Sequence, residues 1–180
     1  MNLPVLPLAN MASRHRGLTS ALAEAYLQAA RVSLDLHHLP PQEFTVRNGA
    51  VESLALIDWQ PADHGCRLAW ANKDDAARDG AYVCALAATE LFMGLFAVKR
   101  AETLTGADYY VAPADKDADD LEDCLRAEIS GTNLDSREVN KRLRSKVNQA
   151  QQGASSLPAI AVVVGFGARL IVMQSVEEAS

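Results

Sequence analysis

The sequence predicts one domain of the α/β (α+β) class. Stretches with the apolar period of a helix alternate along the chain with short runs that resemble strands. The 180 residues are 49% hydrophobic and 22% charged, which is close to average globular usage and long enough to bury one substantial core. We therefore expect a single domain over residues 1–180.

The N-terminal part predicts a helix and a small antiparallel sheet. From Leu18 to about Leu36 apolar residues recur at spacings of three and four, and Pro40-Pro41 ends this pattern. Asn48-Gly49 is a strong hairpin signal between extended runs. The expected strands are Phe44–Val46, Leu54–Trp59 and Arg67–Trp70.

The rest of the chain predicts two further helices and five strands. One helix begins near Asp74 or Asp75 and continues to about Phe96, with a centre that is apolar nearly all round and therefore buried. The other covers Ser136 to Gln152. The expected strands are Ala97–Thr103, Ala107–Ala112, Cys124–Ser130, Ala159–Gly165 and Ala168–Met173.

Charge and cysteine usage restrict the partners and the compartment. The net charge of -6 argues against a protein that coats nucleic acid through bulk charge, so any such site must be a local basic patch. The cysteines Cys66, Cys84 and Cys124 form no CxxC pattern and indicate buried thiols in a reducing compartment. The prolines within Met1–Asn10 do not suit a secretion signal. We expect a cytoplasmic protein without a membrane segment.

Two acids on neighbouring predicted strands suggest a metal site. The strand period places Glu128 on one face together with Arg126 and Ser130, and Asp108 on one face with Tyr110. If the two strands pair antiparallel, Asp108 and Glu128 converge, and such a carboxylate pair needs a cation or a shared proton. Mg²⁺ or Mn²⁺ suits the pair, because magnesium takes one or two carboxylates and keeps several waters.

Glu90 is a third acid of interest because it lies in the middle of the apolar second helix. A buried carboxylate is costly unless it is paired or bound to metal. Two explanations stay open, a place in the site or an ion pair with Lys99 or Arg100. Glu24 in the first helix is expected to be a surface acid, with a part in the site as the alternative.

The helix Ser136–Gln152 concentrates positive charge in an otherwise acidic chain. A solvated helix face would explain the charges, but Arg142, Lys146 and Gln149 are spaced three and four apart on one flank, which could follow a phosphate backbone. The candidate nucleic-acid contacts are Arg137, Lys141, Arg142 and Arg144.

The order of these elements, from Asp74 to Val176, resembles the PD-(D/E)xK nuclease superfamily. The resemblance rests on the helix with Glu90, the strand with Gly106–Tyr110, the strand with Glu128-Ile129-Ser130 and the helix with Lys146 and Gln149. It implies a restriction-endonuclease-like core over residues 74–180, with a mixed central sheet flanked by helices. Residues 1–73 would then be an N-terminal helix and β extension.

The resemblance also implies roles for single residues. Asp108 and Glu128 would bind the metal ion, Glu90 would be the helical acid of many members, and Gln149 or Lys146 the polar residue of the next helix. The chain departs from the family at Ser130, where the motif has a lysine that orients the attacking water. Lys146 is the candidate replacement, with Lys141 behind it.

Two functions remain open at this stage. The first is a metal-dependent endo- or exonuclease, acting on DNA ahead of RNA. The second is suggested by Ser130: a non-catalytic module with a nuclease-like fold, which binds nucleic acid, a protein partner or a second copy of the chain in a bacterial (phage) defence or mobile-element system. A small-molecule enzyme of another α/β type is weaker, because no nucleophile elbow, P-loop or dinucleotide loop occurs.

Overall fold

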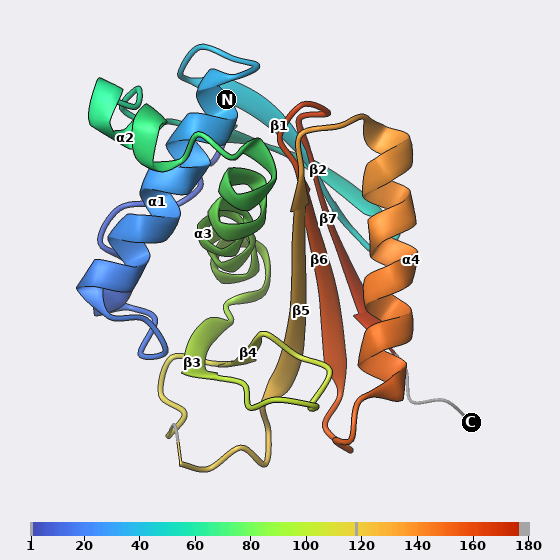
Figure 1. Cartoon of the computed structure of the whole chain (residues 1–180). Coiled ribbons are helices and arrows are strands. Elements are labelled where there is room, and N and C mark those ends of the chain that lie inside the picture. The colour runs from blue at the N-terminus through green and yellow to red at the C-terminus, as the bar shows by residue number, and fades with distance from the viewer. Residues whose placement is uncertain (1, 118, 177–180) are drawn as a thin grey trace.

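A mixed seven-stranded sheet forms the centre of the molecule, with helices against both of its faces (Figure 1). This is a computed structural model, and it describes residues 2–117 and 119–176. The strand order is β2-β1-β7-β6-β5-β4-β3. The strands are β1 (Gln42–Asn48), β2 (Val51–Ile57), β3 (Phe96–Arg100), β4 (Tyr109–Ala112), β5 (Leu125–Thr132), β6 (Ala159–Gly165) and β7 (Leu170–Val176). The predicted class, a mixed α/β fold with a central sheet flanked by helices, is confirmed.

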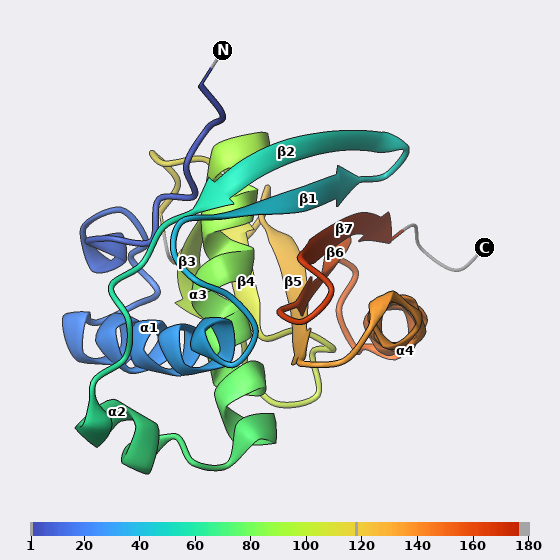
Figure 2. The same cartoon turned by 90° about the horizontal axis from the view of Figure 1, so that it is seen from above.

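The helices form unequal layers around the sheet. Helix α3 (Lys73–Met93) packs on one face and helix α4 (Ser136–Gln152) on the other (Figures 1 and 2). Helix α1 (Ser20–Asp35) crosses the outer side of α3, which explains why α3 is apolar nearly all round. The short helices η1 (Met11–Ser13) and α2 (His64–Ala69) lie on the same side as α1.

Side-chain caps set where the long helices begin. Thr19 accepts a hydrogen bond from the Leu22 amide at the start of α1. Asn72 caps α3 by accepting from two amides of its first turn, and Asp135 caps α4 in the same manner. Helix α3 ends at Gly94, whose φ of 65° lies in the left-handed region that glycine adopts readily.

Two glycines allow the layers to approach closely. A Cβ on Gly80 would lie 2.6 Å from the backbone nitrogen of Ala30, so α1 and α3 cross at van der Waals contact of their backbones. A Cβ on Gly131 in β5 would lie 2.6 Å from Cβ of Ala81 in α3. These two contacts fix α3 between α1 and the sheet.

The second half of the sheet is built in chain order. Strands β3, β4 and β5 pair antiparallel as a meander. The chain then crosses the sheet through α4 and returns as β6, which is parallel to β5. Strand β7 closes the core by pairing antiparallel with β6.

The N-terminal strands differ from the prediction in two respects. The hairpin β1–β2 does not form a separate small sheet, because β1 pairs parallel with β7 and thereby joins the central sheet. The predicted strand Arg67–Trp70 is wrong. Its residues belong to the end of α2, whose first turn is capped by Asp63. The local apolar pattern did not reveal this capped start.

Candidate active site

Asp108 and Glu128 lie next to each other where strands β4 and β5 separate. In the antiparallel pair of β4 and β5, Tyr109 lies opposite Ala127. One residue further along the same register, Asp108 lies opposite Glu128. The Asp108 amide donates to the Ala127 carbonyl at 2.8 Å. Since β4 begins only at Tyr109, the Ile129 amide finds no strand partner and donates instead to Oδ2 of Asp108 at 2.7 Å.

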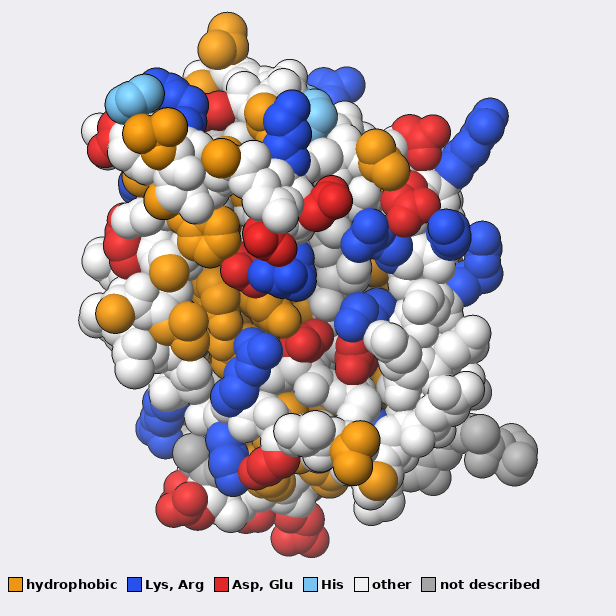
Figure 3. Space-filling view, in the orientation of Figure 1, with side chains coloured by type: hydrophobic (Ala, Val, Ile, Leu, Met, Phe, Trp, Pro, Cys, Tyr) orange, Lys and Arg blue, Asp and Glu red, His pale blue; other side chains and the backbone are white. Residues whose placement is uncertain are grey.

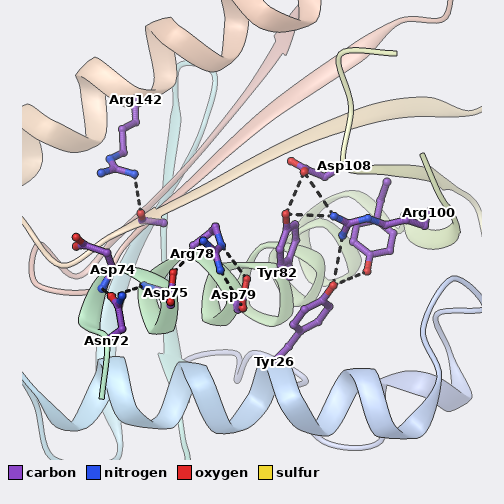
Figure 4. A network of polar contacts seen from close by, with 12 residues as sticks. Tyr26, Asn72, Asp74, Asp75, Arg78, Asp79, Tyr82, Arg100, Asp108 and Arg142 are labelled. Atoms are coloured by element: carbon purple, nitrogen blue, oxygen red, sulfur yellow. Dashed lines mark hydrogen bonds and ion pairs between the residues drawn. The ribbon is translucent and has the colours of Figure 1, made fainter. Parts of the chain in front are cut away.

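The Asp108 carboxylate is oriented from the α3 side as well. The Tyr82 hydroxyl donates to its Oδ1 at 3.0 Å (Figure 4). Burial, together with the negative charge of Asp108, raises the pKa of Tyr82 to about 12, so the phenol keeps its proton and stays a donor. Asp108 is therefore held by two donors, one on each of its oxygens.

Glu128 is buried and pairs with a cation from α4. Its Oε2 lies 2.7 Å from Nζ of Lys146, and its side chain is 8% exposed. Oε1 accepts no hydrogen bond within the described part of the chain, yet it reaches solvent. Burial raises the pKa of Glu128, and the nearby Asp108 charge adds to this, while Lys146 opposes it.

One face of β5 meets α4 in a regular series. Every second residue of β5 points towards α4, and residues four positions apart on α4 point back towards β5. The two sets of side chains therefore meet in pairs along one interface. The contacts run from Arg126 to the Ala150 carbonyl at 2.9 Å, from Glu128 to Lys146 at 2.7 Å, and from Ser130 to Arg142 at 3.4 Å.

Ser130 stands where the motif of the PD-(D/E)xK superfamily has lysine, and a cation from α4 contacts it. Nη1 of Arg142 lies 3.4 Å from its hydroxyl and 3.0 Å from the Gly131 carbonyl. Nε of Arg142 donates to Glu138 at 2.9 Å. Arg142 thus occupies the end of the series, while Lys146 is the cation that contacts Glu128.

Two adjoining cavities open over the site and share Lys146 and Gln149. One, of about 620 Å³, is bounded by Arg100, Glu128 and the segment that joins β3 to β4. The other, of about 540 Å³, contains Asp108 and Tyr82. Glu128 therefore lines one cavity and Asp108 the other, with Lys146 and Gln149 on the boundary between them.

The remaining predicted basic residues lie farther along α4. Lys141 is 74% exposed and lies 3.7 Å from Glu138. Arg137 and Arg144 line a separate hollow with Lys141 and Leu134. Figure 3 shows basic and acidic side chains gathered over α4 and between α4 and α3. Lys141 therefore borders the cavity of Asp108, whereas Arg137 and Arg144 line neither cavity of the site.

Glu90 does not share the site of Asp108 and Glu128. Its carboxylate lies 2.7 Å from Nε of Arg14 and 2.8 Å from Nε2 of the buried His15. Nδ1 of His15 in turn accepts from the Ala97 amide at 2.9 Å. Glu90 of α3 is thus paired with residues of the N-terminal segment.

The two partners predicted for Glu90 are engaged elsewhere. Lys99 lies 2.9 Å from Glu102, and Arg100 contacts tyrosines. The prediction of an ion pair with either residue was wrong, because Arg14 and His15 belong to a segment some 75 residues away in sequence, for which the pattern gave no signal. Glu24 is 53% exposed, with Arg31 at 4.0 Å, and does not reach the site either.

The acid pair suits a divalent cation that keeps much of its water. No group of three or more His, Cys, Asp or Glu side chains that could hold a metal occurs among residues 2–117 and 119–176. Magnesium does not require such a group, since one or two carboxylates plus water are sufficient. Glu128, whose Oε1 accepts no hydrogen bond in the described chain, and Asp108 opposite it in the strand register fit this donor set.

Four residues near the acid pair were not predicted: Tyr26, Tyr82, Arg100 and Tyr109. Their contacts join α1, α3, β3 and β4, so they depend on how these elements pack. The one usable signal was Tyr82, a tyrosine on an otherwise alanine-rich buried helix, because a buried phenol needs a hydrogen-bond partner.

Comparisons with known proteins gave no match. No family model fits the chain, and no curated protein or solved structure is significantly similar to it. Within the described residues, no helix has the length and apolar character needed to cross a membrane.

Proposed function

We propose that the chain is a Mg²⁺- or Mn²⁺-dependent nuclease that hydrolyses phosphodiester bonds, with DNA as the favoured substrate over RNA. The observation that carries the proposal is that the strand register sets Asp108 opposite Glu128, that Lys146 pairs with Glu128, and that Lys146 lines both the cavity with Glu128 and the cavity with Asp108. Two carboxylates and one lysine in that order are the parts that a PD-(D/E)xK site requires. Here the lysine comes from α4 instead of from β5.

The topology supports the same proposal. A buried helix, an antiparallel three-stranded meander, a crossover helix and a parallel strand follow one another as α3, β3–β4–β5, α4 and β6. This is the element order on which the resemblance rests. Asp108 precedes the second strand of the meander and Glu128 lies within the third.

Each side chain has a distinct task in the proposed reaction. Asp108 and Glu128 would hold the cation, and Tyr82 and the Ile129 amide keep the Asp108 carboxylate in one orientation. A divalent cation bound there would lower the pKa of a water that serves as the nucleophile and would offset charge on the leaving oxygen. The Lys146 ammonium, 2.7 Å from Glu128, orients the attacking water and balances the negative charge that develops on the phosphate.

Cations beside the site provide a path for the nucleic-acid backbone. Arg78 on α3 and Lys141, Arg142 and Lys146 on α4 border the same cavity as Asp108. Arg78 is 60% exposed and Lys141 is 74% exposed, so both reach solvent. Phosphates of a strand lying between α3 and α4 would meet cations on both sides.

Cleavage assays with matched variants test this proposal. Plasmid, linear and single-stranded DNA and RNA are incubated with Mg²⁺, Mn²⁺ or EDTA. We expect metal-dependent cutting that falls about 100-fold or more in Asp108→Asn, Glu128→Gln and Lys146→Met. The control Lys99→Met removes a surface lysine outside the cavities and should cut normally. Cutting that survives both acid substitutions would refute the proposal.

A negative result on the native chain has its own meaning. Absence of cutting and of Mg²⁺ binding under every condition would favour the non-catalytic module. That module would act with a protein partner, nucleic acid or a second copy of the chain in a cytoplasmic phage-defence or mobile-element system. Ser130 in place of the motif lysine is the residue that favours this second candidate.

A further inference from the structure

Arg100 is held by three tyrosines that come from three different elements. Its Cζ lies 5.0 Å from the ring centroid of Tyr82 and 4.8 Å from that of Tyr109. Its Nη1 donates to the Tyr26 hydroxyl at 3.3 Å, and that hydroxyl is 2.9 Å from the Tyr109 hydroxyl. We call Tyr26, Tyr82 and Tyr109 the tyrosine cage. Figure 4 shows Arg100 between Tyr26, Tyr82 and Asp108.

The cage holds the guanidinium in place while leaving most of its donors unused. Within the described chain, hydrogen bonds from Arg100 reach only the hydroxyls of Tyr26 and Tyr82, the second at 3.5 Å. A guanidinium has five N–H donors, so three of them, including that on Nε, have no partner among these residues. The side chain is 50% exposed and lines a cavity, so the guanidinium can be reached from solvent.

Neutralising Asp108 does not explain the position of Arg100. An arginine that pairs with a carboxylate normally forms short, often bidentate hydrogen bonds. Here Nη2 stays 4.0 Å from Oδ1 of Asp108, and the Tyr82 hydroxyl donates to that oxygen at 3.0 Å instead. Tyr82 satisfies Asp108 and keeps the guanidinium apart from it, so the donors of Arg100 stay available for another anion.

The location of Arg100 indicates which anion this would be. Arg100 borders the cavity of about 620 Å³ together with Glu128, Lys146 and Gln149. Lys146 is already paired with Glu128, whereas Arg100 has no ion pair shorter than 4.0 Å in the described chain. A planar fork of free N–H groups suits the oxygens of a phosphate.

We propose that Arg100, held by the tyrosine cage, binds a phosphate of the substrate strand directly at the candidate active site. This inference rests on the proposed nuclease function for its substrate, but the phosphate-binding property can be measured without cleavage. The tyrosines act as positioning residues, since they fix Arg100 before the substrate arrives and so reduce the entropy lost on binding. Arginine is required because lysine offers no fork and stacks less well between rings.

Binding and cleavage are tested separately. The first probe is inorganic phosphate, titrated while the Nε–H signal of Arg100 is followed by NMR, with Arg100→Lys used to assign the signal. The second is a fluorescent single-stranded DNA in EDTA, followed by anisotropy. We expect phosphate to shift the Arg100 signal, and Arg100→Gln to weaken DNA binding about 10-fold, with Arg100→Lys recovering only part of the loss.

Lys99→Gln is the matched control, because it removes the adjacent cation, which is outside the tyrosine cage and paired with Glu102. It should leave the phosphate-induced shift unchanged and bind DNA within about twofold of the native chain. Equal losses in Arg100→Gln and Lys99→Gln would overturn the inference, because they would indicate unspecific charge attraction.

The outcomes separate this inference from the nuclease proposal. Cutting by the native chain, with no phosphate-induced shift and an unchanged KM in Arg100→Gln, would overturn the role of Arg100 and keep the nuclease. A clear shift without any cutting would support the phosphate site and overturn the nuclease. If Arg100 were only a structural residue, Arg100→Gln would lower Tm without changing DNA binding at temperatures where the variant is folded, and the inference would fail.

Discussion

Glu90 connects the N-terminal segment to helix α3 through Arg14 and His15, both of which it contacts at less than 3 Å. Glu90→Gln removes the charge from this cluster and leaves His15, which is fully buried, beside a weaker acceptor. We expect a loss of about 1–3 kcal/mol in the free energy of unfolding and normal cleavage per folded molecule. Chemical denaturation and the cleavage assay check this. Glu24→Gln, at an exposed acid, should lose less than about 0.5 kcal/mol. Lost cleavage in a stable Glu90→Gln protein would contradict the structural role.

The raised pKa of Glu128 makes stability depend on pH in a defined direction. Burial lifts the pKa above its ordinary 4.5, so the folded chain binds this proton more tightly than the unfolded chain. The resulting contribution to stability is complete below pH 4.5 and is lost as pH rises through the folded-state pKa.

Glu128→Gln removes this dependence. Relative to the native chain, the variant should therefore become more stable as the pH is raised from about 4 to about 7. Tm measured at several pH values without metal ions checks the trend. A Tm difference between Glu128→Gln and the native chain that stays constant across this range would contradict the raised pKa of Glu128.

The residues of the site were predictable only where local geometry decides their position. The two-residue period of a strand and one antiparallel pairing are sufficient to set Asp108 opposite Glu128. Helical spacing put Lys146 on a basic flank, the resemblance suggested it as the replacement for the motif lysine, and the structure places it against Glu128. Tyr82 and Arg100 were missed because their contacts depend on the packing of α3 against the β3–β4 hairpin, which periodicity does not specify.

At the scale of elements, the crossing of α1 over α3 depends on Gly80. Gly80→Ala would place a Cβ 2.6 Å from the Ala30 backbone nitrogen. Because the contacting atoms belong to the backbone, the clash can be relieved only by a shift of one helix relative to the other. We expect a loss of about 1–3 kcal/mol, as for other overpacked sites, although alanine has the better helix propensity. Gly65→Ala in α2, where a Cβ meets nothing closer than 3.4 Å, is the matched control and should be neutral or slightly stabilising. Denaturation that gives both variants the same stability would contradict the tight crossing.

The predicted elements differ in how strongly the sequence specified them. The helices α1, α3 and α4 begin within a few residues of the predicted starts, because apolar period and capping residues agree. Helix α2 was mistaken for a strand, since six residues are too few to show a helical period. The parallel pairing of β1 with β7 joins segments more than 120 residues apart and left no local trace.

For the whole molecule, the structure ties residues 1–73 to the remainder at several points. Strand β1 extends the sheet beyond β7, α1 covers the outer side of α3, and Arg14 and His15 pair with Glu90. Without these residues the buried surface of α3 around Gly80 and the free edge of β7 would face water. An exposed apolar helix and an open strand edge both favour aggregation.

We therefore expect that residues 74–180, produced alone, do not fold, although the resemblance covers just this part of the chain. The full chain should unfold in one transition with the same midpoint by far-UV circular dichroism and by tryptophan fluorescence. Both tryptophans, Trp59 and Trp70, lie in the N-terminal part, so coincident midpoints would show that this part and the sheet unfold together. A monomeric 74–180 fragment with a cooperative transition, or a separate early fluorescence change in the full chain, would show instead that the N-terminal part is an accessory layer. In that case, α3 would have to be stable with one side uncovered, which its nearly complete burial argues against.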